Sequence, residues 1–292
     1  MITVGLPFAN SAGTLPLAVQ SVIEQSFQDW EMVLLDDGSS DGSLAIARGF
    51  EDPRISVVSD GSNRGLPARL NEIARSSNRA WMARMDADDV MHPVRLATQL
   101  AYGGIHDLDV VGSTVYVINE QNVVYGVKNP GPLPGTSEGY LRNGAFVHPS
   151  VIGLTSWFVA NPYNESLRRA QDKELWLRTH AHSRFGKVDI PLLYYREMGN
   201  FRLGLYRATC RADRQILRQY APQIIGARRA LQAVVKSYGK EGLNIALSGT
   251  RAHTRLMQAR SVVPNGSTLA DGQRVLDALV VHLNHNHVRP DE

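Results

Sequence analysis

The first 90 residues alternate short apolar runs with segments of helical periodicity, and this alternation constrains the fold more strongly than any other feature. The apolar runs are predicted to form strands at Ile2–Leu6, Met32–Leu35, Ile55–Val58 and Trp81–Met85. Between these runs, apolar residues recur at the spacing of one helix face. Continuously apolar strands separated by helices are typical of a parallel sheet that is covered on both faces. We therefore expect an α/β fold that begins βαβαβαβ.

The pattern changes after Met85 and again near residue 203. A helix is expected over 93–103, further strands at 110–118, 123–127 and 192–195, and another helix from about Gln171. From residue 203 onward the spacing is helical, with a loop predicted near 264–266. A length of 292 residues suits one large domain or two modest ones. We expect an α/β domain over 1–202 and a basic helical C-terminal region over 203–292.

The net charge of +3 is unevenly distributed along the chain. Residues 1–200 contain 17 basic and 22 acidic side chains, whereas residues 201–260 contain 12 basic and two acidic ones. Apolar positions recur among these basic residues, as in amphipathic helices. Such helices over 203–260 can bind an anionic membrane surface, or can pack their apolar face on the acidic first region. Nucleic-acid binding is not expected, because aromatic side chains are not interleaved with the basic ones.

Composition excludes several classes of protein. With 43% hydrophobic and 20% charged residues, the chain can bury a sizeable core. Cys210 is the single cysteine, so neither an internal disulfide nor a zinc site with several thiolates is expected. Two stretches without charged side chains, 1–23 and 143–164, are interrupted by proline, glycine and asparagine, which argues against membrane spans. No signal peptide is expected, and we predict a cytoplasmic protein.

Acidic residues follow two of the predicted strands directly. Asp36 and Asp37 follow the second strand, and Asp86, Asp88 and Asp89 follow the fourth. In open α/β sheets, ligands bind beyond the carboxyl ends of the strands. Five carboxylates at one edge repel one another unless a cation lies among them, and hard divalent cations bind carboxylates together with ligand phosphates. The sequence therefore predicts a metal–diphosphate site, although aspartates after strands also form turns and helix caps.

A series of motifs resembles the ordered landmarks of the family 2 glycosyltransferases. The motifs, which cover about residues 1–200, are Val4-Gly5-Leu6-Pro7-Phe8, Leu35-Asp36-Asp37-Gly38-Ser39, Asn63-Arg64-Gly65-Leu66, Met85-Asp86-Ala87-Asp88-Asp89, His148-Pro149-Ser150, Gln171-Asp172-Lys173-Glu174 and Tyr195-Arg196. The resemblance implies a GT-A fold, a Rossmann-like mixed sheet flanked by helices, and inversion at the anomeric carbon. It further implies a bacterial surface-polysaccharide type of enzyme. Residues 203–292 contain no motif of that family.

The resemblance also implies a nucleotide site. By position, Asp37 would hydrogen-bond the nucleotide base, and Leu6, Pro7 and Phe8 would line the pocket for the base and ribose. Asn63 would belong to the same site. Arg69, like Arg64, follows the third predicted strand and could contact the donor phosphates, although surface arginines are more often only solvated.

Metal binding is the second role that the resemblance implies. Asp88 would ligate Mn²⁺ or Mg²⁺ bridging the donor diphosphate, and Asp86 would face the ribose or the metal and its water shell. Such a metal stabilises the negative charge that grows on the departing diphosphate. The resemblance thus gives a chemical reason for the acidic cluster after the fourth strand.

Inversion needs one protein base, and the resemblance places Asp172 in that role. Asp172 could instead be a first-turn acid that interacts with the helix dipole. Glu174 is the nearest competitor, but two residues further along a helix it points to another face. Asp172 is therefore the predicted catalytic base.

Together these features predict a metal-dependent inverting glycosyltransferase. Its donor would be a nucleotide sugar, taken to be UDP-linked, and its acceptor a saccharide or lipid-linked saccharide in surface polysaccharide synthesis at the inner face of the membrane. A sugar nucleotidyltransferase is one rival, but the segment 7–13 lacks the basic residues that such enzymes use to hold a triphosphate. A non-catalytic scaffold of an assembly complex is the other. The oligomeric state, sugar and linkage stay open.

Overall fold

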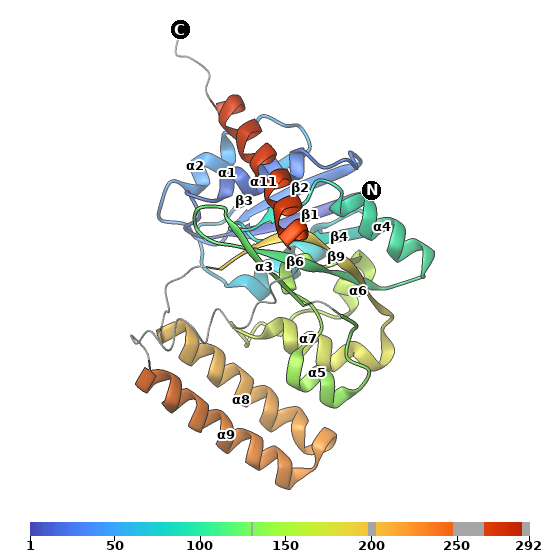
Figure 1. Ribbon diagram of the computed structural model, residues 1–292, viewed down its shortest axis with the longest axis vertical. Helices are drawn as coiled ribbons and strands as arrows, with labels where there is room; N and C mark the ends of the chain where they lie inside the picture. Colours follow the sequence, from blue (N-terminus) through green and yellow to red (C-terminus); the bar gives the residue numbers. More distant parts are fainter. Residues whose placement is uncertain (130, 198–202, 248–265, 288–292) are drawn as a thin grey trace.

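One mixed nine-stranded sheet forms the centre of the computed structural model, which describes residues 1–129, 131–197, 203–247 and 266–287 (Figure 1). Its path runs in the order β3-β2-β1-β4-β8-β6-β9-β5, with β7 paired to β6. In chain order the strands are β1 (Ile2–Phe8), β2 (Trp30–Asp36), β3 (Ile55–Ser59), β4 (Trp81–Arg84), β5 (Val90–Met91), β6 (Val110–Ile118), β7 (Val124–Lys128), β8 (Ile152–Leu154) and β9 (Phe185–Arg196).

The N-terminal half of the sheet is parallel, as the apolar runs predict. Strand β1 pairs in parallel with both β2 and β4, and β2 pairs in parallel with β3. The register places Phe8 opposite Asp36 and Asp36 opposite Ser59, so these three strands end at one edge. Strand β8 is antiparallel to β4 and β6. The sheet is therefore mixed, which confirms the expected α/β class.

Helices cover both faces of this sheet and enclose three apolar cores among the described residues, of which the third lies beneath α11 (Gly266–His287). The first core lies against α1 (Leu15–Ile23), α2 (Ser43–Arg48) and α4 (Arg95–Ile105). The second is covered by α3 (Leu66–Ser76), α5 (Ser137–Asn143), α6 (Thr155–Ala160) and α7 (Gln171–Thr179). Trp176 is completely buried in the second core, and truncating a buried aromatic of this size costs roughly 3–5 kcal/mol of stability.

Glycine at position 5 lets α3 approach the sheet closely. A Cβ atom at Gly5 in β1 would lie 2.8 Å from Cγ2 of Ile73, which is a buried residue of α3. Since interiors are close-packed, a larger side chain there would force α3 away from β1. The close approach matters because α3 also carries Arg69.

The helices after residue 203 lie in two separate places. Helices α8 (Leu203–Ile225) and α9 (Ala227–Leu247) form an antiparallel hairpin at one end of the molecule, joined at Gly226 with φ of 81° (Figure 1). Helix α11 (Gly266–His287) instead packs on α1 and β7. Its Leu276 and Leu279 are buried against the sheet side chains Tyr116 and Tyr194. The boundary expected at 202 stays a prediction.

The basic hairpin packs on the α/β part through α8. Ala212 and Ile216 of α8 belong to the second core, which also contains Trp176. None of the helices described here combines the length and the apolar character needed to cross a bilayer. Residues 248–265, which include the predicted loop before residue 266, lie outside the described part of the chain.

Candidate active site

Asp36 and Asp37 stand at the carboxyl end of β2, where they play different roles. Oδ1 of Asp36 accepts a hydrogen bond from the Ser39 amide at 3.0 Å, and Oδ2 accepts one from the Ser59 hydroxyl at 2.8 Å. Burial acts to raise the pKa of Asp36, but these hydrogen bonds outweigh it and the pKa is lowered. Asp36 therefore ties the ends of β2 and β3 together.

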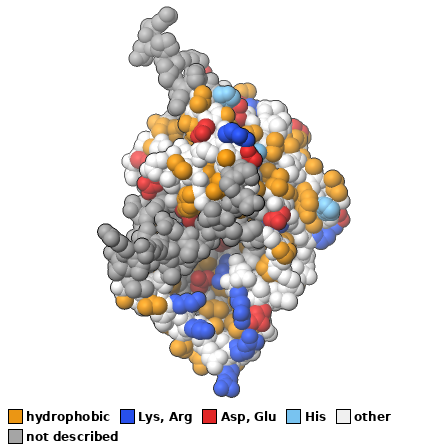
Figure 2. Space-filling view, in the orientation of Figure 1, with side chains coloured by type: hydrophobic (Ala, Val, Ile, Leu, Met, Phe, Trp, Pro, Cys, Tyr) orange, Lys and Arg blue, Asp and Glu red, His pale blue; other side chains and the backbone are white. Residues whose placement is uncertain are grey.

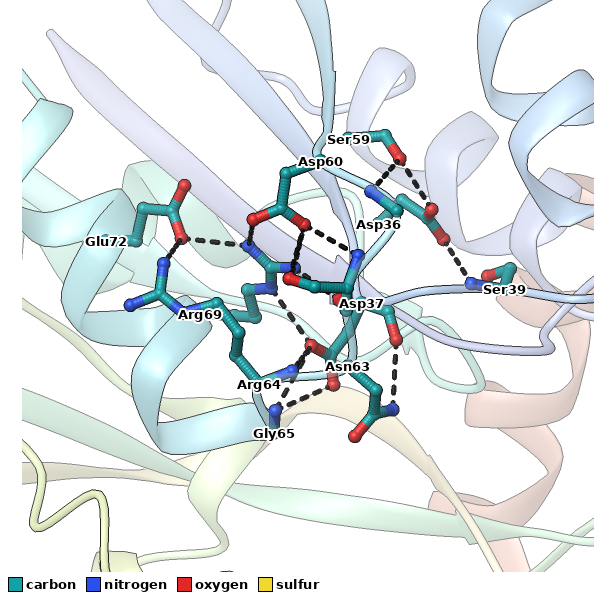
Figure 3. Close-up of polar contacts among 12 residues, drawn as sticks. Asp36, Asp37, Ser39, Ser59, Asp60, Asn63, Arg64, Gly65, Arg69 and Glu72 are labelled. Atoms are coloured by element: carbon teal, nitrogen blue, oxygen red, sulfur yellow. Dashed lines mark hydrogen bonds and ion pairs between the residues drawn. The ribbon is translucent and has the colours of Figure 1, made fainter.

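Asp37 is held by the N-terminal end of α3 (Figure 3). Oδ1 accepts hydrogen bonds from the amides of Arg64 and Gly65 at 2.7 and 3.1 Å, and from Nε of Arg69 at 3.0 Å. The Asn63 side-chain amide donates to the Asp37 carbonyl at 3.0 Å. Gly65 has φ of 87°, a conformation in which a residue with a Cβ is strained. The loop geometry thus fixes this carboxylate at the sheet edge.

The position of Arg69 disagrees with the expected contact to donor phosphates. Only 1% of the residue is exposed, and its guanidinium donates to Asp37, Asp60, Glu72 and the Ser62 carbonyl (Figure 3). A planar guanidinium whose donors are all directed at these acceptors has none left for a ligand. Arg69 therefore acts through Asp37, which it positions.

The other nucleotide-site candidates lie on β1. Leu6 and Pro7 are buried inside the strand, with the side chain of Leu6 in the first core. Phe8 ends the strand, and its carbonyl accepts a hydrogen bond from the Asp37 amide at 2.8 Å. The structure therefore brings Phe8, Asp37 and Asn63 together, while their contacts to a nucleotide stay predictions.

Three carboxylates form a cluster after β4. One oxygen from each of Asp86, Asp88 and Asp89 lies within 4.8 Å of the others. Asp86 and Asp88 are partly exposed, whereas Asp89 is 1% exposed and accepts a hydrogen bond from the Arg196 amide at 2.8 Å. The other oxygen of Asp89 is buried without a hydrogen-bond partner among the described residues. Asp89 was not assigned to the metal from the sequence, although it adjoins Asp88 in the same acidic run.

Electrostatics in this cluster favours a cation. Burial, followed by the charge of Asp86, raises the pKa of Asp88 to about 6. Burial together with the charges of Asp88 and Asp86 also raises the pKa of Asp89 well above its usual range. A divalent cation would relieve this repulsion and would give the unpartnered oxygen of Asp89 a partner. The all-oxygen donor set suits Mg²⁺ or Mn²⁺, so the residues present fit such an ion.

Two arginines that support the acidic cluster complete the site. Arg196, at the end of β9, donates from Nε to the Asp88 carbonyl at 2.7 Å and from Nη1 to the Asn119 carbonyl at 2.7 Å. Arg84, at the end of β4, is buried and pairs through Nη2 with Asp86 at 2.6 Å. Nε and Nη1 of Arg84 have no hydrogen-bond partner among the described residues. Sequence reasoning gave Arg84 no role, although an arginine within an apolar run directly before an acidic cluster is an unusual signal.

Asp172 lies in the first turn of α7 and is partly exposed. Burial raises its pKa, while the Lys173 amide and the charge of Arg84 oppose the shift. Asp172 and Asp86 therefore share Arg84 as a cationic neighbour. The competing acid Glu174 is buried, and its carboxylate accepts hydrogen bonds from Arg178 at 3.0 Å and from the Tyr220 hydroxyl at 2.5 Å. Of the two acids, Asp172 is therefore the more exposed, and its role as the base stays a prediction.

Comparison with known proteins identifies the family. The family described as "Glycosyl transferase family 2" matches residues 3–175, more than half of the chain. The chain belongs to glycosyltransferase family 2. This assignment confirms the resemblance carried by the motifs and places the acidic cluster and Asp37 inside the matched segment of the family 2 chain.

Named relatives and solved structures agree with that assignment. The putative glycosyltransferase EpsE of Bacillus subtilis is 32% identical over 186 residues, which cover 61% of this chain and 66% of EpsE. The Escherichia coli protein "UDP-Glc:alpha-D-GlcNAc-diphosphoundecaprenol beta-1,3-glucosyltransferase WfgD" is 24% identical over 178 residues, covering 61% of this chain and 68% of WfgD. The family 2 chain thus spans about two thirds of the length of these relatives.

Two solved structures show the same fold. Staphylococcus aureus TarS 1–349, crystallised with UDP-GlcNAc, has a TM-score of 0.61 and 18% identity, covering 86% of this chain and 74% of that one. The mannosyltransferase PcManGT of Pyrobaculum calidifontis, in complex with GDP-Man and Mn²⁺, has a TM-score of 0.56 and 18% identity, covering 98% and 87% of the two chains. These similarities confirm the GT-A fold expected for a family 2 chain.

Proposed function

We propose that this chain is a metal-dependent inverting glycosyltransferase that uses a nucleotide sugar, UDP-linked, as its donor. The observation that carries the proposal is that the site contains two distinct sets of carboxylates, a cluster of three and a single one on another element. Asp86, Asp88 and Asp89 form a cluster that favours a cation, whereas Asp172 approaches from α7 with a pKa raised by burial. Arg84 pairs with Asp86 and also influences Asp172, which supports a single site that combines metal binding with proton acceptance.

Donor binding is assigned to the edge formed by β1, β2 and the start of α3. Asp37 is held there by three hydrogen-bond donors, and we propose that its remaining lone pairs accept a hydrogen bond from the nucleotide base. A carboxylate that accepts from an imide N–H recognises uracil by its hydrogen-bonding edge. The structure of TarS with UDP-GlcNAc supports this donor class.

The proposed metal is Mn²⁺ or Mg²⁺, with Asp88 as the main ligand and Asp86 and Asp89 beside it. The bound ion would stabilise negative charge on the departing diphosphate. PcManGT, which was solved with GDP-Man and Mn²⁺, supports a divalent metal in this fold. Arg196 and Arg84 keep the acidic cluster in place through the hydrogen bonds and the ion pair described above.

Asp172 is proposed as the base that accepts the acceptor hydroxyl proton. The hydroxyl oxygen attacks the anomeric carbon, the bond from that carbon to the diphosphate oxygen breaks, and the proton ends on Asp172. Attack from the face opposite the leaving group inverts the configuration. A raised pKa makes the Asp172 carboxylate a better proton acceptor near neutral pH.

A saccharide attached to a lipid diphosphate is the acceptor that we infer, in surface polysaccharide synthesis at the inner face of the membrane. WfgD, whose name specifies a diphosphoundecaprenol-linked substrate, supports this inference. Helix α9 exposes Leu231, Val235 and Tyr238, which recur at helical spacing. Hydrophobic and basic side chains lie side by side at the hairpin end of the molecule (Figure 2). Such a face suits peripheral contact with an anionic bilayer. Part of the predicted membrane-binding region, residues 248–260, lies outside the described chain.

The proposal is tested by nucleotide-induced thermal stabilisation. We expect UDP and UDP-sugars to raise the melting temperature in Mn²⁺ but not in EDTA, because a ligand that binds only the native state stabilises it. Incubation with each stabilising sugar nucleotide should then release UDP in the presence of Mn²⁺. A panel of nucleotides that leaves the melting temperature unchanged with Mn²⁺ would contradict the proposal and favour a scaffold.

A further inference from the structure

A groove rich in arginine lies between α8 and α9, away from the acidic cluster. Its volume is about 490 Å³, and its lining residues are Arg207, Arg211, Arg214, Arg218, Tyr238, Glu241, Gly242 and Ile245. The four arginines follow one another at four-, three- and four-residue steps, so they share one face of α8. Figure 2 shows basic side chains gathered at this end of the molecule. We call this feature the arginine groove.

Internal contacts engage three of the four arginines but bury only one, and they leave the groove strongly positive. Arg214 is 4% exposed, pairs with Glu241 at 2.6 Å and lies over the Tyr238 ring at 4.1 Å. Arg218 donates to the Tyr238 hydroxyl at 2.9 Å, and Arg207 lies 3.5 Å from Glu241. Among the described residues that line the groove, Glu241 is the single acid, against four arginines. The exposed guanidinium groups are therefore available to an anion that carries several charges.

The arginine groove adjoins the donor side of the active site. A second hollow, lined by Arg168 and Arg169, shares Arg211 with it. The Nε of Arg168 lies 3.9 Å from the place that a Cβ would take at Gly65, whose amide holds Asp37. Helix α8 is also tied to α7 by the ion pair Lys173–Asp213 at 3.0 Å, next to Asp172. The groove is thus connected to the loop that holds Asp37 through the second hollow, and to the helix of Asp172 through α8.

An apolar surface begins at the same groove. Tyr238 lines the groove. It also shares one exposed face of α9 with Leu231 and Val235, because the three residues are separated by four and three positions. Phosphate groups suit arginine, whose planar guanidinium binds them in bidentate fashion. An apolar chain suits the neighbouring face. The groove and the face together fit a molecule that joins two phosphates to a hydrocarbon chain.

We propose that the arginine groove binds the diphosphate of a lipid-diphosphate acceptor, with Arg207, Arg211 and Arg218 as its ligands and Arg214 held as their support. This proposal rests on the proposed function in one respect: it takes the bound lipid diphosphate to be the acceptor of the transfer reaction. The donor diphosphate is assigned to the acidic cluster. Binding of a diphosphate at the groove is a separate physical claim, so it can be tested without any sugar transfer.

The test is calorimetric titration of the full chain with inorganic diphosphate and with geranyl diphosphate. EDTA is present, so that no metal carries the diphosphate to Asp86 and Asp88. The variant Arg207→Gln/Arg211→Gln removes two exposed groove charges. The matched control Arg228→Gln/Lys236→Gln removes two exposed charges from α9 outside the groove lining. We expect the first pair to weaken both affinities by at least about tenfold and the control pair to change them less than about twofold.

Two outcomes would overturn the proposal. One is that neither diphosphate binds the unaltered chain; if phosphatidylcholine vesicles containing phosphatidylglycerol bind in that case, the groove belongs to a general membrane surface. The other is that the control pair loses as much affinity as the groove pair. Stabilisation by UDP with Mn²⁺, measured in parallel, reports on the proposed function alone and should be equal in all these variants.

Discussion

Arg69 donates a hydrogen bond from Nε to Oδ1 of Asp37 across 3.0 Å, and only 1% of the arginine is exposed. The two residues are 32 positions apart in the chain, on α3 and after β2. The ion pair therefore couples the orientation of Asp37, which we propose to contact the nucleotide base, to the packing of α3. We therefore expect nucleotide binding at Asp37 to depend on Arg69, although Arg69 is not expected to contact the nucleotide.

Replacing Arg69 with Met should weaken both the fold and nucleotide binding. Asp37 would lose a buried partner, and we expect a loss of about 2–3 kcal/mol in the free energy of unfolding, with weaker UDP binding. Urea denaturation and UDP titration measure the two effects. Arg64→Gln is the matched control, because the Arg64 side chain is exposed and its backbone amide still holds Asp37. An R69M chain that binds UDP normally would contradict the positioning role.

Asp172→Asn should abolish transfer and leave donor binding intact. An amide of the same shape cannot accept the hydroxyl proton, so we expect a fall of about 10²–10⁴-fold in kcat. UDP stabilisation with Mn²⁺ should be unchanged. Glu174→Gln is the comparison: its buried carboxylate holds Arg178 and Tyr220, so the substitution should lower stability and spare kcat in the folded fraction. The reverse pattern would make Glu174 the base.

The pH dependence of transfer follows from the same carboxyl group. Burial raises the pKa of Asp172, and the ionised form is the one that accepts a proton. The value of kcat/KM should therefore fall as the pH drops through that raised pKa, above the usual range for aspartate. A pH–rate profile with saturating Mn²⁺ measures this fall in kcat/KM at low pH. A profile that stays flat down to the ordinary aspartate pKa would argue against Asp172.

Asp88 should make the metal-free protein less stable as the pH rises. Its pKa in the folded state is about 6, above the usual 3.8, so the folded chain binds the proton more tightly than the unfolded chain. This contribution is fully present below the unfolded pKa and is lost as the pH rises through about 6. Melting curves in EDTA across this range should show the loss.

The Asp88→Asn variant should reduce that pH dependence and the response to metal. An uncharged side chain relieves the repulsion from Asp86, so melting temperature in EDTA should vary less with pH. Adding Mn²⁺ should stabilise the unaltered protein more than the variant, and transfer should fall by at least about a hundredfold in the variant. Equal stabilisation of both proteins by Mn²⁺ would contradict the assignment of Asp88 as a ligand.

Gly5→Ala should destabilise the fold, because the new Cβ would meet Ile73 of α3 at 2.8 Å. Overpacking of this kind costs typically about 1–3 kcal/mol. Gly104→Ala provides the contrast, since that helical position has nothing within 4 Å and alanine is the better helix former. We expect this second variant to be as stable as the parent or more so. Chemical denaturation compares the two directly.

Much of the site followed from short patterns in the sequence, and what was missed depends on long-range contacts. The apolar runs predict parallel strands, and the acids after Leu35 and Met85 therefore belong to one edge. No local pattern indicates that Arg69 is buried, because two of its partners, Asp37 after β2 and Asp60 after β3, come from other segments, and only Glu72 lies in the same helix. The family resemblance offered no role for Arg84, whose environment is likewise set by the fold.

Sequence periodicity also could not predict that α11 packs on the sheet. A helical spacing reveals an apolar face but does not specify the surface that covers it. Leu276 and Leu279 are covered by Tyr116 and Tyr194, far earlier in the chain. The charge split between 1–200 and 201–260 predicted a basic region that includes the hairpin, since six of the ten arginines in 201–260 lie in α8 and α9. It carried no information about the helix that follows.

The packing of α11 has a practical consequence for anyone who trims this chain. The C-terminal helices cover apolar surface of the α/β part in two places. Truncation after residue 202 would expose the α7 residues that share a core with Ile216, and also Tyr116 and Tyr194, which pack with Leu276. A shortened protein would therefore be expected to aggregate through newly exposed apolar surface. Assays of the groove and of the active site are best made on one uncut polypeptide.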